Sequence, residues 1–332
     1  MAGATTYGDG STVNREDLLD LLSVLEPEKT PVTSLAGKSA KPGNLFTEWG
    51  LDAYDVPEFD AVEQGADVTD FDNKTKNRER VGNYQQKIRR SWMVTTEQEA
   101  TDTAGHGSDV AESKARCMVE LKRDIESAIC SDQEMSASNP TALRGIGKWL
   151  QSTAQSVNPV PTAYLTPAGN INTTATGSLA DSDINGVLQS MYENSGNDMS
   201  RTTLVAGPNL RSAVTNLQRS VGGGAGNPYT VNQDAKEHNI TFRVDEYVGD
   251  YGRIFVVPTL FNGRVTGDTT LTAQASARGY LIDPDYLSLY YMKAPVMKDL
   301  EDQGAGPRGF AEVILSLCVK HPQALGKFSA TS

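Results

Sequence analysis

The stretch GHGSDVAESKARCMVELKRDIESAICSD (residues 105–132) predicts one long helix in a chain otherwise rich in glycine, threonine and short apolar runs. Ser108 or Asp109 can cap its N-terminus, so we expect the helix over about 109–131. About 23 residues at 1.5 Å each make a rod of roughly 35 Å. Its apolar side chains recur at helical spacing on one broad face: Val110, Cys117, Met118, Leu121, Ile125, Ala128 and Ile129. A long rod with a single apolar face indicates a backbone on which sheets pack.

The charge changes sign abruptly upstream of this helix. Residues 43–72 contain no lysine or arginine but nine acids: Glu48, Asp52, Asp55, Glu58, Asp60, Glu63, Asp67, Asp70 and Asp72. Residues 74–96 are basic, with Lys74, Lys76, Arg78, Arg80, Lys87, Arg89 and Arg90 against the single acid Glu79. The flanks NLFTEWGLDAY (44–54) and NYQQKIRRSWMV (83–94) alternate as strands do. The pattern predicts a long hairpin between these flanks, with one acidic and one basic arm.

A hairpin of this length buries too little surface to be stable alone in water, so we expect it to lie against a neighbouring copy of the chain. The alternative is a solvated hairpin whose two arms neutralise each other. The residues predicted to form the inter-subunit interface are charged and lie on both arms: Glu58, Asp60, Glu63, Asp67, Lys74, Lys76, Arg78, Arg80, Arg89 and Arg90.

The remaining elements predict an α+β fold, because strands and helices do not alternate steadily. A short helix is expected within residues 14–25, followed by an extended arm. Two helices, at 181–194 and 208–221, surround the short strand TTLVAG (202–207). Strands dominate afterwards, in residues 239–249, 252–259, 277–293 and 311–322.

Composition excludes several classes of protein. A net charge of −12 over 332 residues argues against a general nucleic-acid binder, although it is compatible with a protein that encloses nucleic acid. Three cysteines without paired spacing do not resemble a disulfide framework, and we expect buried free thiols in a reducing compartment. No apolar stretch reaches the roughly 18 residues of a membrane span, and the start MAGATTYGDG lacks the features of a secretory signal.

No motif for catalysis or metal binding was found. The histidines, His106, His238 and His321, are far apart and do not have zinc-site spacing with the cysteines. The segment SVGGGAGNPY (220–229) lacks the Gly-Lys-Ser/Thr ending of a phosphate-binding loop and follows a predicted helix instead of preceding one. We therefore predict no catalytic, cofactor-binding or metal-binding residue and expect a protein that is not an enzyme.

Four stretches resemble successive signatures of one branch of tailed-bacteriophage major capsid proteins with the Hong Kong 97-type fold. They are EKTPVTSLAGKSA (28–40), NLFTEWGLDAY (44–54), NYQQKIRRSWMVTTEQEATDTAG (83–105) and VELKRDIESAI (119–129). The resemblance is detailed over the first 130 residues or so and rests on the order of elements beyond them.

The resemblance implies four parts: an N-terminal arm (1–46), an extended loop (47–92), a peripheral domain (93–146 and 287–332) built on the spine helix, and an axial domain (147–286). It implies a structural protein that assembles as pentamers and hexamers into an icosahedral shell enclosing double-stranded DNA. The protein would belong to the virion and assemble in the host bacterial cytoplasm. Its partners would be copies of itself and separate scaffolding, decoration and portal proteins, with no membrane contact, no N-terminal scaffolding segment and no predicted crosslink.

Three rival classes are less favoured by the sequence than a viral shell. An encapsulin-like compartment shares the fold but holds enzymes instead of DNA. A soluble mixed-fold enzyme would form a small fixed oligomer with a polar pocket. A tail component would show repeats or all-β patterning.

Overall fold

The computed structural model describes residues 29–69, 71–101, 108–196, 198–220, 246–263 and 273–329. The helix expected within residues 14–25, the histidines His106 and His238, and the glycine segment 222–226 lie outside these residues.

The long helix predicted from the sequence is α3, Asp109–Ile129. The Ser108 side chain caps it by accepting a hydrogen bond from the backbone N–H of Ala111. Its apolar face is buried at Cys117, Leu121, Ile125 and Ile129, as the helical spacing predicts. The structure adds one acid to this buried face, Glu126.

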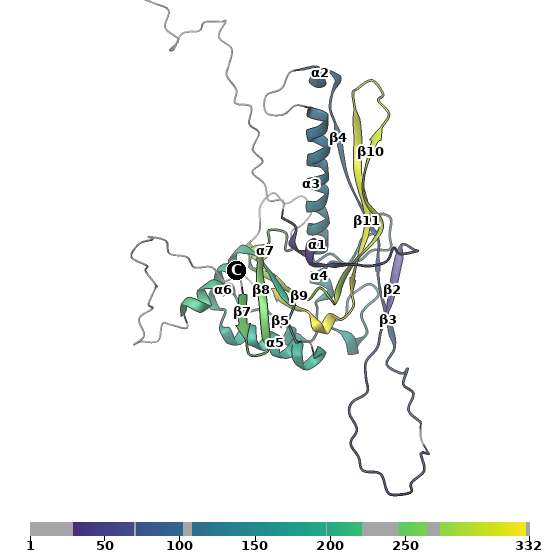
Figure 1. Cartoon of the computed structure of the whole chain (residues 1–332), viewed down its shortest axis with the longest axis vertical. Helices are drawn as coiled ribbons and strands as arrows, with labels where there is room; N and C mark the ends of the chain where they lie inside the picture. Colours follow the sequence, from purple (N-terminus) through teal and green to yellow (C-terminus); the bar gives the residue numbers. More distant parts are fainter. Residues whose placement is uncertain are drawn as a thin grey trace, which may run out of the picture.

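A four-stranded sheet packs against α3 (Figure 1). Its strands are β1 (Gly37–Lys38), β10 (Leu287–Leu300), β11 (Arg308–Val319) and β4 (Gln86–Met93), in that order. β10 and β11 form a long antiparallel hairpin, and β4 pairs antiparallel with β11. Alternate residues of β11 are buried against α3: Ala311, Val313, Leu315 and Leu317. The opposite side of this sheet is turned away from the helix, since successive strand residues point to opposite faces.

A six-stranded mixed sheet forms the second part of the molecule. Its strand order is β5 (Ile171–Asn172), β12 (Gly326–Ser329), β9 (Arg278–Ile282), β6 (Thr203–Ala206), β8 (Gly252–Pro258) and β7 (Glu246–Gly249). The helices α5 (Asp181–Ser195) and α6 (Pro208–Ser220) pack on it through a second apolar core that includes Ile184, Leu188, Leu204 and Val214. The mixture of helices and mainly antiparallel strands confirms the predicted α+β class.

Short helices complete the fold. They are α1 (Pro31–Leu35), α2 (Thr96–Glu99), α4 (Ile146–Trp149) and α7 (Ala273–Ala277), with 3₁₀ turns at Thr162–Tyr164, Ala168–Asn170, Thr176–Ser178 and Pro322–Ala324. A buried hydrogen bond joins the six-stranded sheet to the end of α3, because the Tyr280 hydroxyl on β9 donates to the carbonyl of Cys130 at 3.0 Å. β12 lies in the six-stranded sheet, where it pairs antiparallel with β9 and parallel with β5.

The predicted hairpin is shorter than its sequence pattern indicates. β2 (Phe46–Leu51) and β3 (Glu79–Tyr84) pair antiparallel over six residues each, and then Gln85 separates β3 from β4. No strand occurs between residues 52 and 78 in the described part of this segment. The segment 83–94 is extended, as predicted, but β4 pairs with β11 and belongs to the four-stranded sheet.

Candidate inter-subunit surface

Residues 52–78, hereafter the loop, extend away from both sheets (Figure 1). The loop carries large apolar side chains that are at least 72% exposed: Tyr54, Val56, Phe59, Val62, Val68 and Phe71. A soluble monomer seldom exposes so many apolar side chains in one segment, and such patches mark interaction sites.

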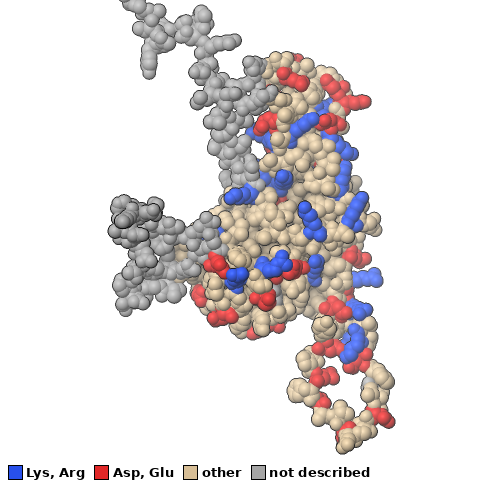
Figure 2. Space-filling view, viewed as in Figure 1, with Lys and Arg blue, Asp and Glu red and all other residues tan. Residues whose placement is uncertain are grey.

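The first limb of the loop also carries the predicted acids. Glu58, Asp60, Glu63 and Asp67 are exposed, and no ion pair joins them to any other described residue. Figure 2 shows acidic side chains around the loop. The segment therefore presents apolar groups and unpaired carboxylates together, a composition that suits a partner with both apolar and basic groups.

Basic residues in the second half of the loop form ion pairs with acids near the root of the loop. Arg78 Nε lies 2.8 Å from Asp52 Oδ2, and Lys76 Nζ lies 3.0 Å from Asp55 Oδ1. Lys74 Nζ lies 3.0 Å from Asp72 Oδ2 and 3.5 Å from Asp55 Oδ2. The hydrogen bond from Lys76 lowers the pKa of Asp55. Mutual neutralisation of the two arms therefore occurs at these residues, although exposed ion pairs contribute little stability.

The other predicted basic residues are separated by the structure. Arg80 is exposed on β3, opposite Gly50. Arg89 and Arg90 lie outside the loop, on opposite faces of β4. Arg90 Nη2 lies 2.7 Å from Asp124 Oδ1 on α3, whereas Arg89 Nη2 lies 3.3 Å from Glu312 Oε2 on the other side of the sheet. Arg90 thus pairs with α3 of its own subunit, and Arg89 lies on the face of the four-stranded sheet that is turned away from α3.

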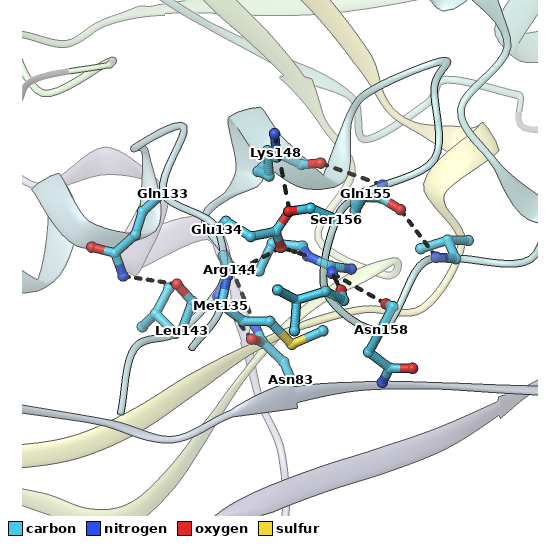
Figure 3. Close-up of polar contacts among 12 residues, drawn as sticks. Asn83, Gln133, Glu134, Met135, Leu143, Arg144, Lys148, Gln155, Ser156 and Asn158 are labelled. Carbon is cyan, nitrogen blue, oxygen red and sulfur yellow. Dashed lines mark hydrogen bonds and ion pairs between the residues drawn. The ribbon is translucent and has the colours of Figure 1, made fainter. Parts of the chain in front are cut away.

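The root of the loop is fixed by a buried polar network (Figure 3). Asn83, on β3, donates from Nδ2 to the carbonyls of Arg144 and Leu317 at 3.2 and 2.9 Å. Its Oδ1 accepts from the backbone N–H of Arg144 at 2.8 Å. One asparagine therefore ties β3, the strand that follows the loop, both to β11 and to the segment that follows α3.

Arg144 is the centre of this network, and its side chain is fully buried. Its Nε donates to Glu134 Oε1 at 2.7 Å, and Nη2 donates to the carbonyls of Asn158, at 3.1 Å, and Val157. The guanidinium lies 4.8 Å from the ring centroid of Trp149. Burial lowers the pKa of Arg144, while Glu134 acts in the opposite direction. An arginine held on several sides makes a rigid support from which the loop projects.

A second anchor holds the N-terminal arm on α3. The Glu126 carboxylate accepts the backbone N–H groups of Val32 and Thr33 at 2.7 and 2.8 Å, and it also accepts the Thr33 hydroxyl. These N–H groups belong to the first turn of α1, which has no side-chain cap of its own. Burial raises the pKa of Glu126. Sequence reasoning missed both anchors, because their partners are 61 and 94 residues apart in the chain.

The described residues contain no group of three or more histidine, cysteine, aspartate and glutamate side chains that could hold a metal ion. Within the same residues, no helix combines the length and apolar character needed to cross a membrane. All three cysteines are buried free thiols, as expected.

A spine helix under a long hairpin, a second mixed sheet and an outstretched loop make up the Hong Kong 97-type fold, as the match to solved phage capsid structures shows. The capsid of cyanophage A-1(L) matches 97% of this chain and 99% of its own, with a TM-score of 0.67 and 14% identity. The capsid of a native GTA particle matches 100% of both chains, with a TM-score of 0.65 and 11% identity.

An encapsulin from Synechococcus elongatus also matches, over 96% of this chain and 92% of its own, with a TM-score of 0.53 and 12% identity. At such identities these likenesses establish the fold alone. The family is established by sequence: the SU10 major capsid protein family matches residues 4–332, and the chain belongs to it. The protein is a major capsid protein of a phage. No curated protein matches the chain.

Proposed function

We propose that copies of this chain associate through the loop into pentamers and hexamers, which close into an icosahedral shell around double-stranded DNA. The observation that carries this proposal is the exposure of Tyr54, Phe59 and Phe71, each at least 87% exposed on a segment that leaves its own subunit. Full burial of one such side chain is worth about 1.5–3 kcal/mol, and a neighbouring subunit is the surface available at every position in a shell.

Shell closure requires that the contact be heterologous, with the loop of one copy on a different surface of the next. Such contacts form closed rings when the rotation between copies closes. Each contact can be modest, since ordering the loop offsets part of the burial and many contacts add over a closed assembly. The buried network at Asn83 and Arg144 supports this role, because it fixes the direction of the loop in the subunit before assembly.

We further propose that the protein is not an enzyme and that it encloses DNA without binding it tightly. The net charge of −12 supports this, because an acidic wall leaves packaged phosphates free to enter and leave. Assembly would take place in the host bacterial cytoplasm, with separate scaffolding, decoration and portal proteins as partners.

The test is to express the full chain and examine it by size exclusion and negative-stain microscopy, alone and with phage lysate as a source of scaffold. Shells or five- and sixfold rings are the expected result. The double variant Phe59→Ser with Phe71→Ser should stay folded and lose assembly. The matched variant Phe59→Leu with Phe71→Leu keeps apolar area and should assemble. Normal shells from the serine variant would exclude the loop as the contact.

The second candidate function is an encapsulin-like compartment, which the structural match to an encapsulin supports. The two functions differ in cargo. Particles recovered from infected cells should contain nuclease-protected DNA if the viral function is right, and a captured protein if the compartment is right.

A further inference from the structure

A cavity of about 820 Å³ lies on the side of α6 that faces away from the second apolar core. Its volume is within the range, about 300–1,000 Å³, of pockets that bury a ligand. The residues that α6 contributes are spaced three and four apart and therefore share one face of the helix, while the other face packs in the core. They are Pro208, Arg211, Ser212, Thr215 and Asn216.

The chain that leaves β8 forms another part of the cavity wall. Pro258 is exposed there, Leu260 is half-buried and Phe261 is buried. Arg211 Nη1 donates to the carbonyl of Val256 at 2.7 Å, so a hydrogen bond ties the α6 side of the cavity to β8. The cavity is therefore built on a fixed frame, and its surface is mainly apolar.

Lys29 completes the wall and is the first described residue of the chain. Two residues later the chain enters α1, whose Val32 and Thr33 are held by the carboxylate of Glu126 on the spine helix. The N-terminal part of the chain therefore reaches the spine helix by way of the cavity. No acid is among the described residues that line the cavity, so Lys29 and Arg211 make its wall positively charged.

The sequence just before Lys29 is both acidic and apolar. Residues 14–28 contain five acids and one base. The helix expected within residues 14–25 carries Leu18, Leu22 and Leu25 along one side, at positions i, i+4 and i+7. An amphipathic helix binds an apolar groove through side chains at this spacing. The segment thus complements the cavity in both charge and apolar character.

We propose that residues 14–25 form a helix that docks in this cavity of their own subunit, with Leu18, Leu22 and Leu25 against its apolar wall and the acids near its two cations. The chain can reach, since four residues from Leu25 to Lys29 span up to about 14 Å and a twelve-residue helix is about 18 Å long. The inference concerns the single subunit and goes beyond the proposed function. The docked segment would connect the six-stranded sheet to the spine helix through α1.

A neighbouring copy or another protein could offer a similar segment to the cavity. The short tether favours the segment of the same subunit, because a group on a short flexible linker has an effective concentration in the millimolar range. A competing segment in solution would need to be present at a comparable concentration or to bind more tightly.

The test joins the segment to the cavity by a pair of cysteines in the full chain. Leu22→Cys with Ser212→Cys, on α6, is treated with a short bis-maleimide as unassembled subunits. The matched control is Leu22→Cys with Ser91→Cys, because Ser91 is an exposed serine on β4. The three native cysteines are buried and common to both chains. We expect a crosslink within one subunit, at a yield about tenfold or more above the control.

Two further chains test whether the leucines hold the segment. Leu18→Ser with Leu25→Ser, added to the cysteine pair, should reduce the crosslink about tenfold. Leu18→Met with Leu25→Met keeps the apolar contact and should retain the crosslink. The same serine substitutions in the chain without added cysteines should speed hydrogen exchange in α6 and leave exchange in α5 unchanged.

A crosslink that joins two subunits would overturn the proposal and assign the cavity to a neighbouring copy. Crosslinking at the level of the Ser91 control would also overturn it and would leave the cavity to a different protein. Equal yields from the serine and methionine chains would show that the leucines do not dock. Should the cysteine pair not fold, hydrogen exchange decides, and unchanged exchange in α6 of the serine variant would refute the docked helix.

Discussion

The carboxylate of Glu126 in α3 accepts a 2.7 Å hydrogen bond from the backbone N–H of Val32 in α1. It accepts Thr33 as well, through both the N–H and the hydroxyl. A single buried acid thus supplies the cap that α1 lacks and attaches the N-terminal arm to the spine helix.

Replacing Glu126 with alanine should lower the free energy of unfolding of the subunit by about 2–3 kcal/mol, since two N–H groups lose a charged acceptor. Glu126→Gln should fall between alanine and wild type, because an amide oxygen can still accept. Thermal denaturation of unassembled subunits measures both changes. Glu120→Ala, on the same helix, is the matched control and should cost less than about 0.5 kcal/mol. Equal effects at the two positions would contradict the anchor.

The β2–β3 ribbon offers a matched pair of glycines. A Cβ at Gly82 would lie 2.5 Å from Phe46 Cζ and 2.9 Å from the Thr47 carbonyl oxygen, whereas the nearest atom to a Cβ at Gly50 is 4.0 Å away. Gly82→Ala should destabilise the subunit by about 1–3 kcal/mol, and Gly50→Ala should be nearly neutral. Chemical denaturation gives both values, and limited proteolysis of the loop shows whether the ribbon has opened. Comparable stability of the two variants would refute the close packing at Gly82.

Arg144→Lys should be poorly tolerated, although the charge is kept. A lysine cannot reproduce the fork of donors that reaches Glu134, Val157 and Asn158, and its ammonium would be left partly unpaired in a buried site. We expect a loss of about 2–4 kcal/mol, together with faster hydrogen exchange at the loop root. Arg253→Lys is the control: this arginine is 57% exposed beside Glu246, and its replacement should cost less than about 0.5 kcal/mol. Unchanged exchange at the root in Arg144→Lys would mean that the network does not aim the loop.

The parts of the fold that depend on local pattern could be predicted from the sequence. The helix expected over 109–131 is found at Asp109–Ile129, because its apolar spacing and its cap at Ser108 are local signals. The strand character of 83–94 was likewise readable from alternation. The pairing partner of β4 could not be predicted from alternation, since that partner, β11, is more than two hundred residues away in the chain.

The candidate site was predictable only where it depends on local sequence pattern. The inversion of charge located the carboxylates of the loop, and nothing in the described part of the chain pairs with Glu58 or Asp67. The separation of Arg89 from Arg90 follows from the two-residue period of a strand and could have been foreseen. The burial of Glu126 could not have been foreseen. An acid four residues after Lys122 is ordinarily expected to pair with that lysine on the helix surface, and only the packing of α1 against α3 shows that Glu126 is buried.

Glu312 should give the four-stranded sheet a measurable dependence on pH. Hydrogen bonds from Lys293 and Lys87 lower the pKa of Glu312 from 4.5 to about 2. A lowered pKa means that the unfolded chain binds the proton more readily. The stabilisation is therefore fully present above about pH 4.5 and is lost as the pH falls toward 2.

The variant Glu312→Gln lacks this carboxylate and should be less stable than wild type at pH 7 by about 1–2 kcal/mol, a value reduced by solvent screening of the half-exposed cations. Between pH 4.5 and 2 the wild type should lose this advantage, so that the two unfolding free energies converge. Denaturant titrations of unassembled subunits at half-unit steps of pH measure the difference. Glu246→Gln, at an exposed pair with Arg253, should follow the wild type throughout. Parallel curves for wild type and Glu312→Gln down to pH 2 would show that Lys87, Arg89 and Lys293 do not hold this carboxylate.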